Sequence, residues 1–290
     1  MGPTVEEIMT HTIRILGVAA TAVLLATQSL SAAERPLRVG LDGTFAPHAM
    51  PKLGGGGVEG FNVDLANEIG RRLKRKMQIT ATQFSGLLPG LAAGTYDFIV
   101  APTTVTAERA KNVLFTEGYL NTDYQFLVRK DAPNATKLAD FKGKVISVNK
   151  GSAYHKWALG LIGKVGWKIQ SYGTNTDAVQ AVLAGRAYAN VAGNTVIAWA
   201  AKKNPSLKLS YLHSTGRVFA MPFRKNDFAM RNKVEAIIEC MKTDGTMAKM
   251  SQKWFGVTPK AGDAAVTVFA GYGVPGLRGH QPAKHAMKCN

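Results

Sequence analysis

The sequence has 290 residues, of which 46% are hydrophobic and 19% are charged, and its formal net charge is +17 at pH 7. This length suits about two globular domains, and the hydrophobic share excludes a disordered or fibrous chain. Two cysteines exclude a disulfide scaffold and a four-thiolate zinc site, and no apolar run reaches the roughly 18 residues of a membrane-spanning helix.

The first expected element is a signal peptide over residues 1–33. Its 12-residue apolar stretch, Ile15–Ala26, follows Arg14 and leads to Ser31-Ala32-Ala33, small residues that suit cleavage by a signal peptidase. The alternative is a buried helix of the folded protein. Cleavage leaves 257 residues with 35 bases and 17 acids, a net charge of +18. Export argues against nucleic acid as the partner of this basic chain.

After residue 34, short alternating segments and amphipathic segments take turns, which is the pattern of an α/β fold. Strands are expected near 37–41, 77–81 and 98–101, with helices near 65–73 and 87–91. A second series has strands near 145–148, 168–172 and 188–192, with helices near 154–161 and 179–183. Residues 91–97 resemble residues 182–188, and Gly94 and Gly185 would each end a helix in the left-handed conformation. Two similar α/β lobes are predicted, and the pattern leaves open which lobe holds residues 219–256.

The remaining segments carry few signals. Gly54–Gly57 lacks the spacing of a phosphate-binding loop and is predicted to be a flexible hairpin tip. The tail after Phe255 is rich in Gly, Pro and Ala and should be an extended wrap or a mobile extension. Cys240 and Cys289 are the only thiols of an exported chain, so we expect a disulfide between them. His280, His285 and Cys289 match no familiar zinc spacing, and no metal site is expected.

The strongest local signal for binding is Thr104–Arg109, directly after a buried strand. Thr106 suits a helix N-cap, and Arg109 would then lie in the first turn, where a cation opposes the helix dipole. Anionic ligands of α/β proteins sit at the carboxyl ends of strands, so Arg109 could hold a carboxylate through two parallel hydrogen bonds. The alternative is a surface salt bridge from Arg109 to Glu108 or Glu117. No motif of a catalytic elbow or a metalloprotease is present, and no catalytic residue is expected.

Seven segments of the chain stand in the order found in one known family. They are Leu37–Pro47, Gly60–Ala66, Phe84–Leu91, Thr104–Arg109, Gly151-Ser152, Asp244–Thr246 and Lys253–Gly256. On these segments the chain resembles the solute-binding family 3 proteins, which are the periplasmic amino-acid receptors of ABC importers. The resemblance implies the two-lobed type II periplasmic-binding-protein fold, with two crossing strands between the lobes. Lobe I would hold residues 34–122 and a return segment, 219–258; lobe II would hold residues 123–218, followed by a C-terminal extension, 259–290.

The same resemblance implies a ligand site between the lobes. Arg109 would hold the ligand carboxylate, Thr104 and the helix start at Ser152 would assist, Phe45 and Phe84 would sandwich the ligand, and Asp42 would face its polar end. The chain would be a monomeric periplasmic receptor, without a cofactor, that delivers a small carboxylate, most simply an amino acid, to the membrane permease of an ABC importer.

Four positions depart from the family pattern. Asn194 stands where an acid usually neutralises the ligand ammonium, and an amide brings no charge to offset its desolvation. Ala153, Pro102 and His48 replace residues common in the family. Two alternatives therefore stay open: a receptor for an organic anion without an α-ammonium, and a periplasmic enzyme resembling the cyclohexadienyl dehydratases. The second would need an acid in the cleft to move a proton, and Asn194 is not one.

Overall fold

The computed structural model describes residues 34–285, 287 and 289. The expected signal peptide, residues 1–33, lies outside the described residues. No helix in the described part of the chain is both long and apolar enough to cross a bilayer.

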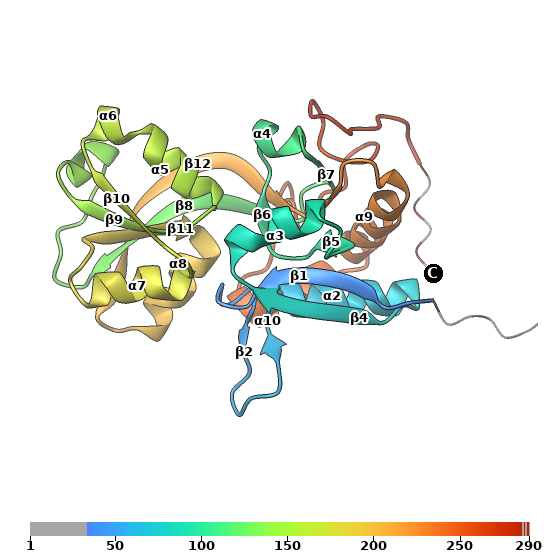
Figure 1. Ribbon diagram of the computed structural model, residues 1–290, viewed down its shortest axis with the longest axis horizontal. Coiled ribbons are helices and arrows are strands. Elements are labelled where there is room, and N and C mark those ends of the chain that lie inside the picture. The colour runs from blue at the N-terminus through green and yellow to red at the C-terminus, as the bar shows by residue number, and fades with distance from the viewer. Residues whose placement is uncertain (1–33, 286, 288, 290) are drawn as a thin grey trace, which may run out of the picture. The chain divides into compact units, whose positions relative to one another are not determined.

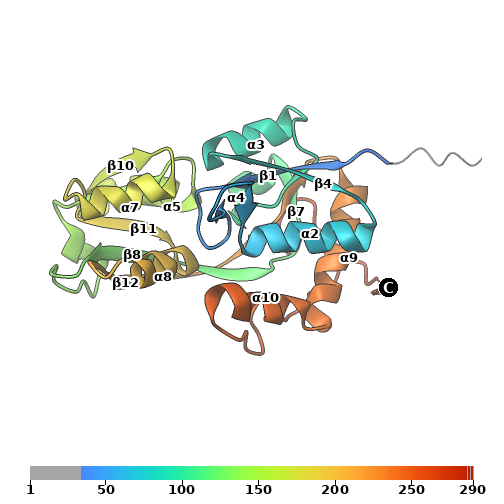
Figure 2. The same cartoon turned by 90° about the horizontal axis from the view of Figure 1, so that it is seen from below.

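The first sheet has the strand order β4-β1-β5-β13-β7 and defines lobe I. Its strands are β1 (Leu37–Asp42), β4 (Met77–Thr82), β5 (Phe98–Ile99), β7 (Val113–Phe115) and β13 (Pro222–Arg224). Its helices are α2 (Phe61–Leu73), α3 (Phe84–Ala92), α4 (Ala107–Ala110), α9 (Phe228–Thr243) and α10 (Thr246–Phe255). Figure 2 shows α3 on one face of the sheet and α2 on the other, where α2 contacts α9 and α10. A hairpin of β2 (Met50–Pro51) and β3 (Val58–Glu59) projects from this lobe (Figure 1), with the glycine run at its tip as predicted.

The second sheet has the order β10-β9-β11-β8-β12-β6 and, apart from β6 (Thr103–Thr104), defines lobe II. Its strands are β8 (Leu120–Arg129), β9 (Val145–Asn149), β10 (Lys168–Tyr172), β11 (Ala189–Gly193) and β12 (Leu207–Ala220). The helices are η1 (Leu138–Phe141), α5 (Ala153–Gly160), α6 (Ile162–Val165), α7 (Asn175–Leu183) and α8 (Asn194–Lys203). α5 and α7 cover one face of this sheet and α8 covers the other (Figure 2).

Two long antiparallel strands, β8 and β12, run between the lobes (Figure 1). At the lobe I end Phe219 of β12 pairs with Leu120 of β8 and with Thr104 of β6. The chain then enters β13, which pairs with β5 and β7, so the segment that sequence periodicity left unassigned returns to lobe I. The resemblance-based expectation of two crossing strands is confirmed, and both sheets belong to one compact unit that begins at Pro36.

Each lobe has its own hydrophobic core. Lobe I buries Val39 and Leu41 of β1 against Ile69 of α2 and Phe223 of β13, and lobe II buries Phe126 and Trp167. Alternating strand residues and helical stripes supply both cores, as the sequence pattern predicts. The third predicted strand of lobe I was too long, because β5 ends at Ile99 and the chain turns toward Pro102 after Val100 N donates to Gly40 O at 2.9 Å.

The C-terminal segment, residues 257–285, packs on lobe I as an extended wrap. The predicted disulfide between Cys240 of α9 and Cys289 is confirmed. Tyr272 and Gln281 form an isolated antiparallel bridge, and the N–H of Ala264 donates to the Asn121 side chain at 2.8 Å. The segment is therefore held by polar contacts as well as by the covalent bond.

Candidate ligand-binding site

Arg109 lies where its local sequence predicts, in the first turn of α4. The Thr106 hydroxyl accepts from the Arg109 N–H at 3.2 Å, which is the expected N-cap. The guanidinium donates to Thr104 O at 2.8 Å and, across the lobes, to Gly151 O at 3.2 Å. It also lies over the Phe84 ring, 5.3 Å from the centroid.

The alternative of a surface salt bridge from Arg109 is wrong. Glu108 pairs with Lys156 and Glu117 pairs with Lys242, and among residues 34–285 no acid forms an ion pair with the Arg109 guanidinium. Burial lowers the pKa of Arg109 to about 10, since a desolvated cation is disfavoured. A partly buried cation whose hydrogen-bond partners are carbonyl oxygens can bind an anion through both charge attraction and hydrogen bonds.

Asp42 is the last residue of β1 and is 2% exposed. Its Oδ1 accepts from the Thr44 N–H at 2.9 Å and from the Thr44 hydroxyl at 2.7 Å. Its Oδ2 is buried and has no hydrogen-bond partner within the described residues. Burial raises the pKa of Asp42, although the hydrogen bonds from Thr44 and the nearby backbone N–H of Phe84 lower it. This oxygen can accept a hydrogen bond from a cationic or neutral donor that enters the site.

A cavity between the two lobes joins these groups. It is lined by Asp42, Phe45, Phe84, Pro102, Thr104, Arg109, Asn149, Ser152, Ala153, Tyr154 and Phe219. Six of the seven residues that the sequence predicts to bind ligand are in this set. The sequence missed Asn149, Tyr154 and Phe219. All three are buried, and Tyr154 and Phe219 have the same apolar surroundings as core residues, so they gave no separate signal. Ser152 caps α5 through a 3.0 Å hydrogen bond from the His155 N–H, so the start of that helix faces the cavity as expected.

The cavity has a volume of about 10 Å³, which is room for one water molecule at most. The lobes are closed on each other by contacts that include the Glu108–Lys156 ion pair and a 3.2 Å hydrogen bond from the Thr176 hydroxyl to Thr44 O. A molecule the size of an amino acid therefore enters only when the lobes separate or the lining side chains turn away.

Asn194 does not line the cavity. Its Oδ1 accepts from the Asp123 N–H at 3.3 Å, at the start of α8 beside the crossing strand β8. The side chain therefore positions the backbone between the lobes in this closed arrangement, and contact between Asn194 and a ligand stays a prediction.

His48 bridges the lobes from a fully buried position. Its Nδ1 lies 2.8 Å from Asn62 Oδ1 in lobe I, and its Nε2 lies 2.8 Å from the Thr195 hydroxyl in lobe II. Burial lowers the pKa of His48 to about 4, so the ring is neutral near pH 7. A neutral imidazole can donate from one nitrogen and accept at the other, which fits both partners.

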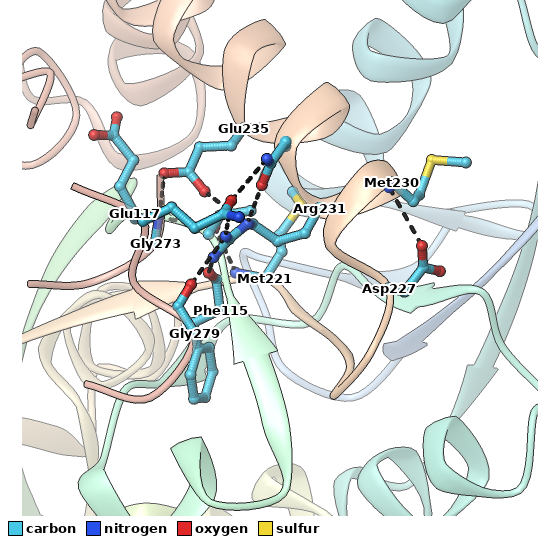
Figure 3. Close-up of polar contacts among 12 residues, drawn as sticks. Phe115, Glu117, Met221, Asp227, Met230, Arg231, Glu235, Gly273 and Gly279 are labelled. Carbon is cyan, nitrogen blue, oxygen red and sulfur yellow. Dashed lines mark hydrogen bonds and ion pairs between the residues drawn. The ribbon is translucent and has the colours of Figure 1, made fainter. Parts of the chain in front are cut away.

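A second polar cluster lies beneath the C-terminal segment (Figure 3). One oxygen each of Glu117, Glu235 and Glu239 lies within 4.8 Å of the others, and all three side chains are buried. Lys242 Nζ is 2.5 Å from Glu117, and Arg231 Nε is 3.6 Å from Glu235. The two cations offset most of the carboxylate charge, and His285 Nε2 lies 2.7 Å from Glu239 Oε2. Cys289 is in the disulfide, so its sulfur is not a thiolate.

Comparison with known proteins gives one consistent result. The family model described as bacterial extracellular solute-binding proteins, family 3, matches residues 37–257. The L-arginine-binding protein of Pseudomonas aeruginosa is 28% identical over 249 residues, which cover 83% of this chain and 95% of that protein.

Two solved structures resemble the fold. An ancestral arginine-binding protein bound to arginine has a TM-score of 0.73 and 31% identity, covering 77% of this chain and 100% of that one. The ancestral amino-acid-binding protein AncCDT-1, described as a precursor of cyclohexadienyl dehydratase, has a TM-score of 0.71 and 30% identity, covering 76% and 95%.

Proposed function

Because the chain belongs to the bacterial extracellular solute-binding proteins of family 3, we propose that it is the periplasmic receptor of an ABC importer for a zwitterionic amino acid. Family members are periplasmic or extracellular binding proteins, and the relatives named above bind amino acids. One observation supports the ligand class. A single cavity is lined both by Arg109, a cation without an acidic partner, and by Asp42, whose buried Oδ2 has no hydrogen-bond partner within the described residues.

The two groups would divide the ligand between them. The Arg109 guanidinium and the N-terminus of α5 would hold the carboxylate, since both offer N–H donors and positive charge. Asp42 would accept from a cationic group of the ligand, either the α-ammonium or a basic side chain. Phe45 and Phe84 would cover the ligand's apolar surface. The closed receptor, as a monomer, would then dock on a membrane permease.

A thermal-shift screen tests the proposal. Protein refolded to strip bound ligand is screened against L-arginine, neutral amino acids, and organic acids that carry no ammonium. A ligand of the native state raises the melting temperature by mass action, so one or more amino acids should do so and the ammonium-free acids should not. Stabilisation by the organic acids alone would favour the alternative receptor for an anion.

Asp42 should make the affinity depend on pH. A bound cation stabilises the ionised carboxylate, so the pKa of Asp42 is lower in the complex than in the free protein, where burial raises it. Binding then releases a proton: affinity is full above the free-state pKa and falls as pH drops below it. Calorimetry should show this fall for the parent and for the surface control Asp131→Asn. Asp42→Asn should bind more weakly near pH 7 and lose the slope, and an unchanged slope would contradict the assignment.

A substitution at Asn194 distinguishes an amino-acid ligand from an organic anion that carries no ammonium. Asn194→Asp adds a carboxylate at the edge of the site, which should strengthen binding of an amino acid and weaken binding of an organic anion, each by about 3-fold to 10-fold for a partly screened charge. Asp177→Asn, also in lobe II but on α7, is the matched control and should change neither affinity. The opposite pair of responses would favour the anion receptor.

An enzymatic role resembling the dehydratases has less support. Of the residues lining the cavity only Asp42 carries a carboxyl group, and lobe II contributes none. Proton transfer in a dehydration needs a correctly placed acid. Turnover of prephenate or arogenate by the purified protein would establish the enzymatic role, and an unchanged substrate after prolonged incubation is expected.

A further inference from the structure

The positive charge of the chain is concentrated in lobe II. Residues 123–218 contain 14 lysines and arginines against four acids, a net charge of +10. The chain from residue 34 onward carries +18, so a lobe of 96 residues holds more than half of it. Solubility alone does not require this unequal distribution, because charge on either lobe would serve it.

Within lobe II the cations gather at the end of the sheet that lies away from the ligand cavity. The carboxyl ends of β9, β10 and β11 lead into α5, α7 and α8, and the start of α5 faces the cavity. The amino ends of these three strands therefore lie at the opposite end of lobe II, on the left in Figure 1. β8 runs antiparallel to β11, and β12 runs antiparallel to β8. The end of β8 and the start of β12 therefore lie at this same end of the sheet.

Backbone pairing aligns a cation on every strand at this end. The Lys168 N–H donates to Lys144 O at 2.8 Å, which brings together the starts of β10 and β9. Arg129 at the end of β8 is opposite Leu207, the residue before Lys208 on β12. Arg186 stands in the turn before β11. A lysine or arginine therefore stands on or next to the same end of each of five neighbouring strands, which are about 4.8 Å apart.

We call this surface the basic end and define it by Arg129, Lys142, Lys144, Lys168, Arg186 and Lys208. All are exposed except Lys208, which is half-buried. Two acids are near it: Asp131 lies 3.5 Å from Arg129, and Asp140 accepts from the N–H groups of Thr136 and Lys137. The other two acids of lobe II, Asp123 and Asp177, lie by the crossing strands and in the first turn of α7.

Helix dipoles explain only part of this arrangement. Lys164, Lys202 and Lys203 are in the last turns of α6 and α8, where a cation is favourable. Of the basic end, Lys142 is the C-cap of η1 and Arg186 follows the end of α7, so a helix C-terminus also favours these two cations. Arg129, Lys144, Lys168 and Lys208 stand at or next to strand ends and are not in the last turn of a helix. Lobe II also has exposed aliphatic side chains. Leu209 follows Lys208 on β12 and is 45% exposed, and Leu159 of α5 and Ile162 of α6 are 45% and 41% exposed.

We propose that the basic end is a peripheral membrane-binding surface that takes the anionic headgroups of phospholipids. Each lysine or arginine near an anionic bilayer adds to the attraction, and exposed aliphatic side chains of the same lobe, such as Leu209 next to Lys208, can enter the interface. An acidic protein surface would be attracted by the same charges but gains less from isolated aliphatic side chains. Attachment through lobe II leaves the cavity at the other end of the lobe open to ligand and keeps the receptor at the membrane surface.

Vesicle co-sedimentation tests this surface in the full chain. The parent should pellet with vesicles of phosphatidylglycerol and phosphatidylcholine in equal parts, should stay in solution with phosphatidylcholine alone, and should be released by high salt. The triple variant Lys142→Glu, Lys168→Glu, Arg186→Glu should lose about 100-fold in apparent affinity, since each lost contact near an anionic surface is worth about fivefold. These three side chains are exposed and, within the described residues, form no hydrogen bond or ion pair. Melting temperature and ligand binding report whether the variant is folded.

The matched control reverses three exposed lysines of lobe I, Lys76→Glu, Lys225→Glu and Lys249→Glu, for the same change in net charge. It should keep most of the parent's vesicle affinity. Equal losses in the two triple variants would show that net charge alone acts and would overturn the basic end as a site. A parent that never pellets with anionic vesicles would also overturn the proposal and would leave an acidic protein as the partner of these cations. If the glutamate variant fails to fold, the corresponding glutamine variant is measured in its place.

Discussion

Arg109→Ala should weaken binding of the amino acid found in the screen by about 30-fold to several thousand-fold. This range corresponds to about 2–5 kcal/mol, the usual cost of leaving one partner of a buried, hydrogen-bonded charge pair alone. Calorimetry measures the change directly. The carboxylate would lose a donor whose position is fixed by the Thr106 cap and by the bond to Thr104 O.

Two further variants make the Arg109 result specific. Arg109→Lys keeps the charge but not the planar pair of donors, so its affinity should lie between those of the parent and Arg109→Ala. Arg186→Ala removes an exposed arginine of lobe II and should leave ligand affinity unchanged. Unchanged affinity in Arg109→Ala, with a normal melting temperature, would remove this guanidinium from the site.

The parts of the site that follow from local sequence were predictable. Thr106 caps α4 because its hydroxyl accepts from the N–H group three residues on, and this position can be found in the sequence. Ser152 caps α5 in the same way, but that helix start was implied by the resemblance. Gly94 and Gly185 both adopt positive φ, 78° and 72°, as helix-ending glycines should. Local rules place the backbone at the mouth of the cavity and thereby place Arg109.

The parts of the site that depend on contacts between residues distant in sequence could not be predicted. Asn194 has the position of a ligand residue, but its side chain bonds to the Asp123 N–H, 71 residues away, and the choice between these partners depends on how far the lobes are closed. Tyr154 follows the helical stripe of α5 and is predicted as core, although it also lines the cavity. Phe219 belongs to a crossing strand whose place only the resemblance implied.

In the C-terminal segment, too, one feature could be predicted from the sequence and another could not. Two cysteines in an exported chain predict one disulfide by elimination, and that prediction is confirmed. The charged cluster beneath the segment has no sequence signature, because Glu117 precedes β8 whereas Glu235, Glu239 and Lys242 lie on α9. Spacing along α9 predicts that its acids share a face, but not that this face is buried by residues 257–285.

Lys242→Met should destabilise the protein by about 3–5 kcal/mol, the usual cost of removing one partner of a buried ion pair. Lys242 is 3% exposed, and its Nζ donates to Glu117 Oε1 at 2.5 Å, Gly118 O at 2.6 Å and Thr267 O at 2.8 Å. Methionine fills similar volume but offers no donor, so a carboxylate and two carbonyl oxygens lose their partner. The melting temperature should fall by about 6–20 °C for a chain of this size.

The matched control is Lys233→Met, on the same helix but exposed, which should change stability by less than about 0.5 kcal/mol. The double variant Glu117→Gln, Lys242→Met removes both charges and should recover part of the loss, because the buried carboxylate no longer lacks a counter-charge. One oxygen of Glu117 lies within 4.8 Å of one oxygen each of Glu235 and Glu239, so its neutralisation also relieves repulsion among the three carboxylates. A double variant as unstable as the sum of the two single variants would mean that Lys242 acts through its carbonyl contacts and not through Glu117, and would contradict the ion pair as the source of the stability.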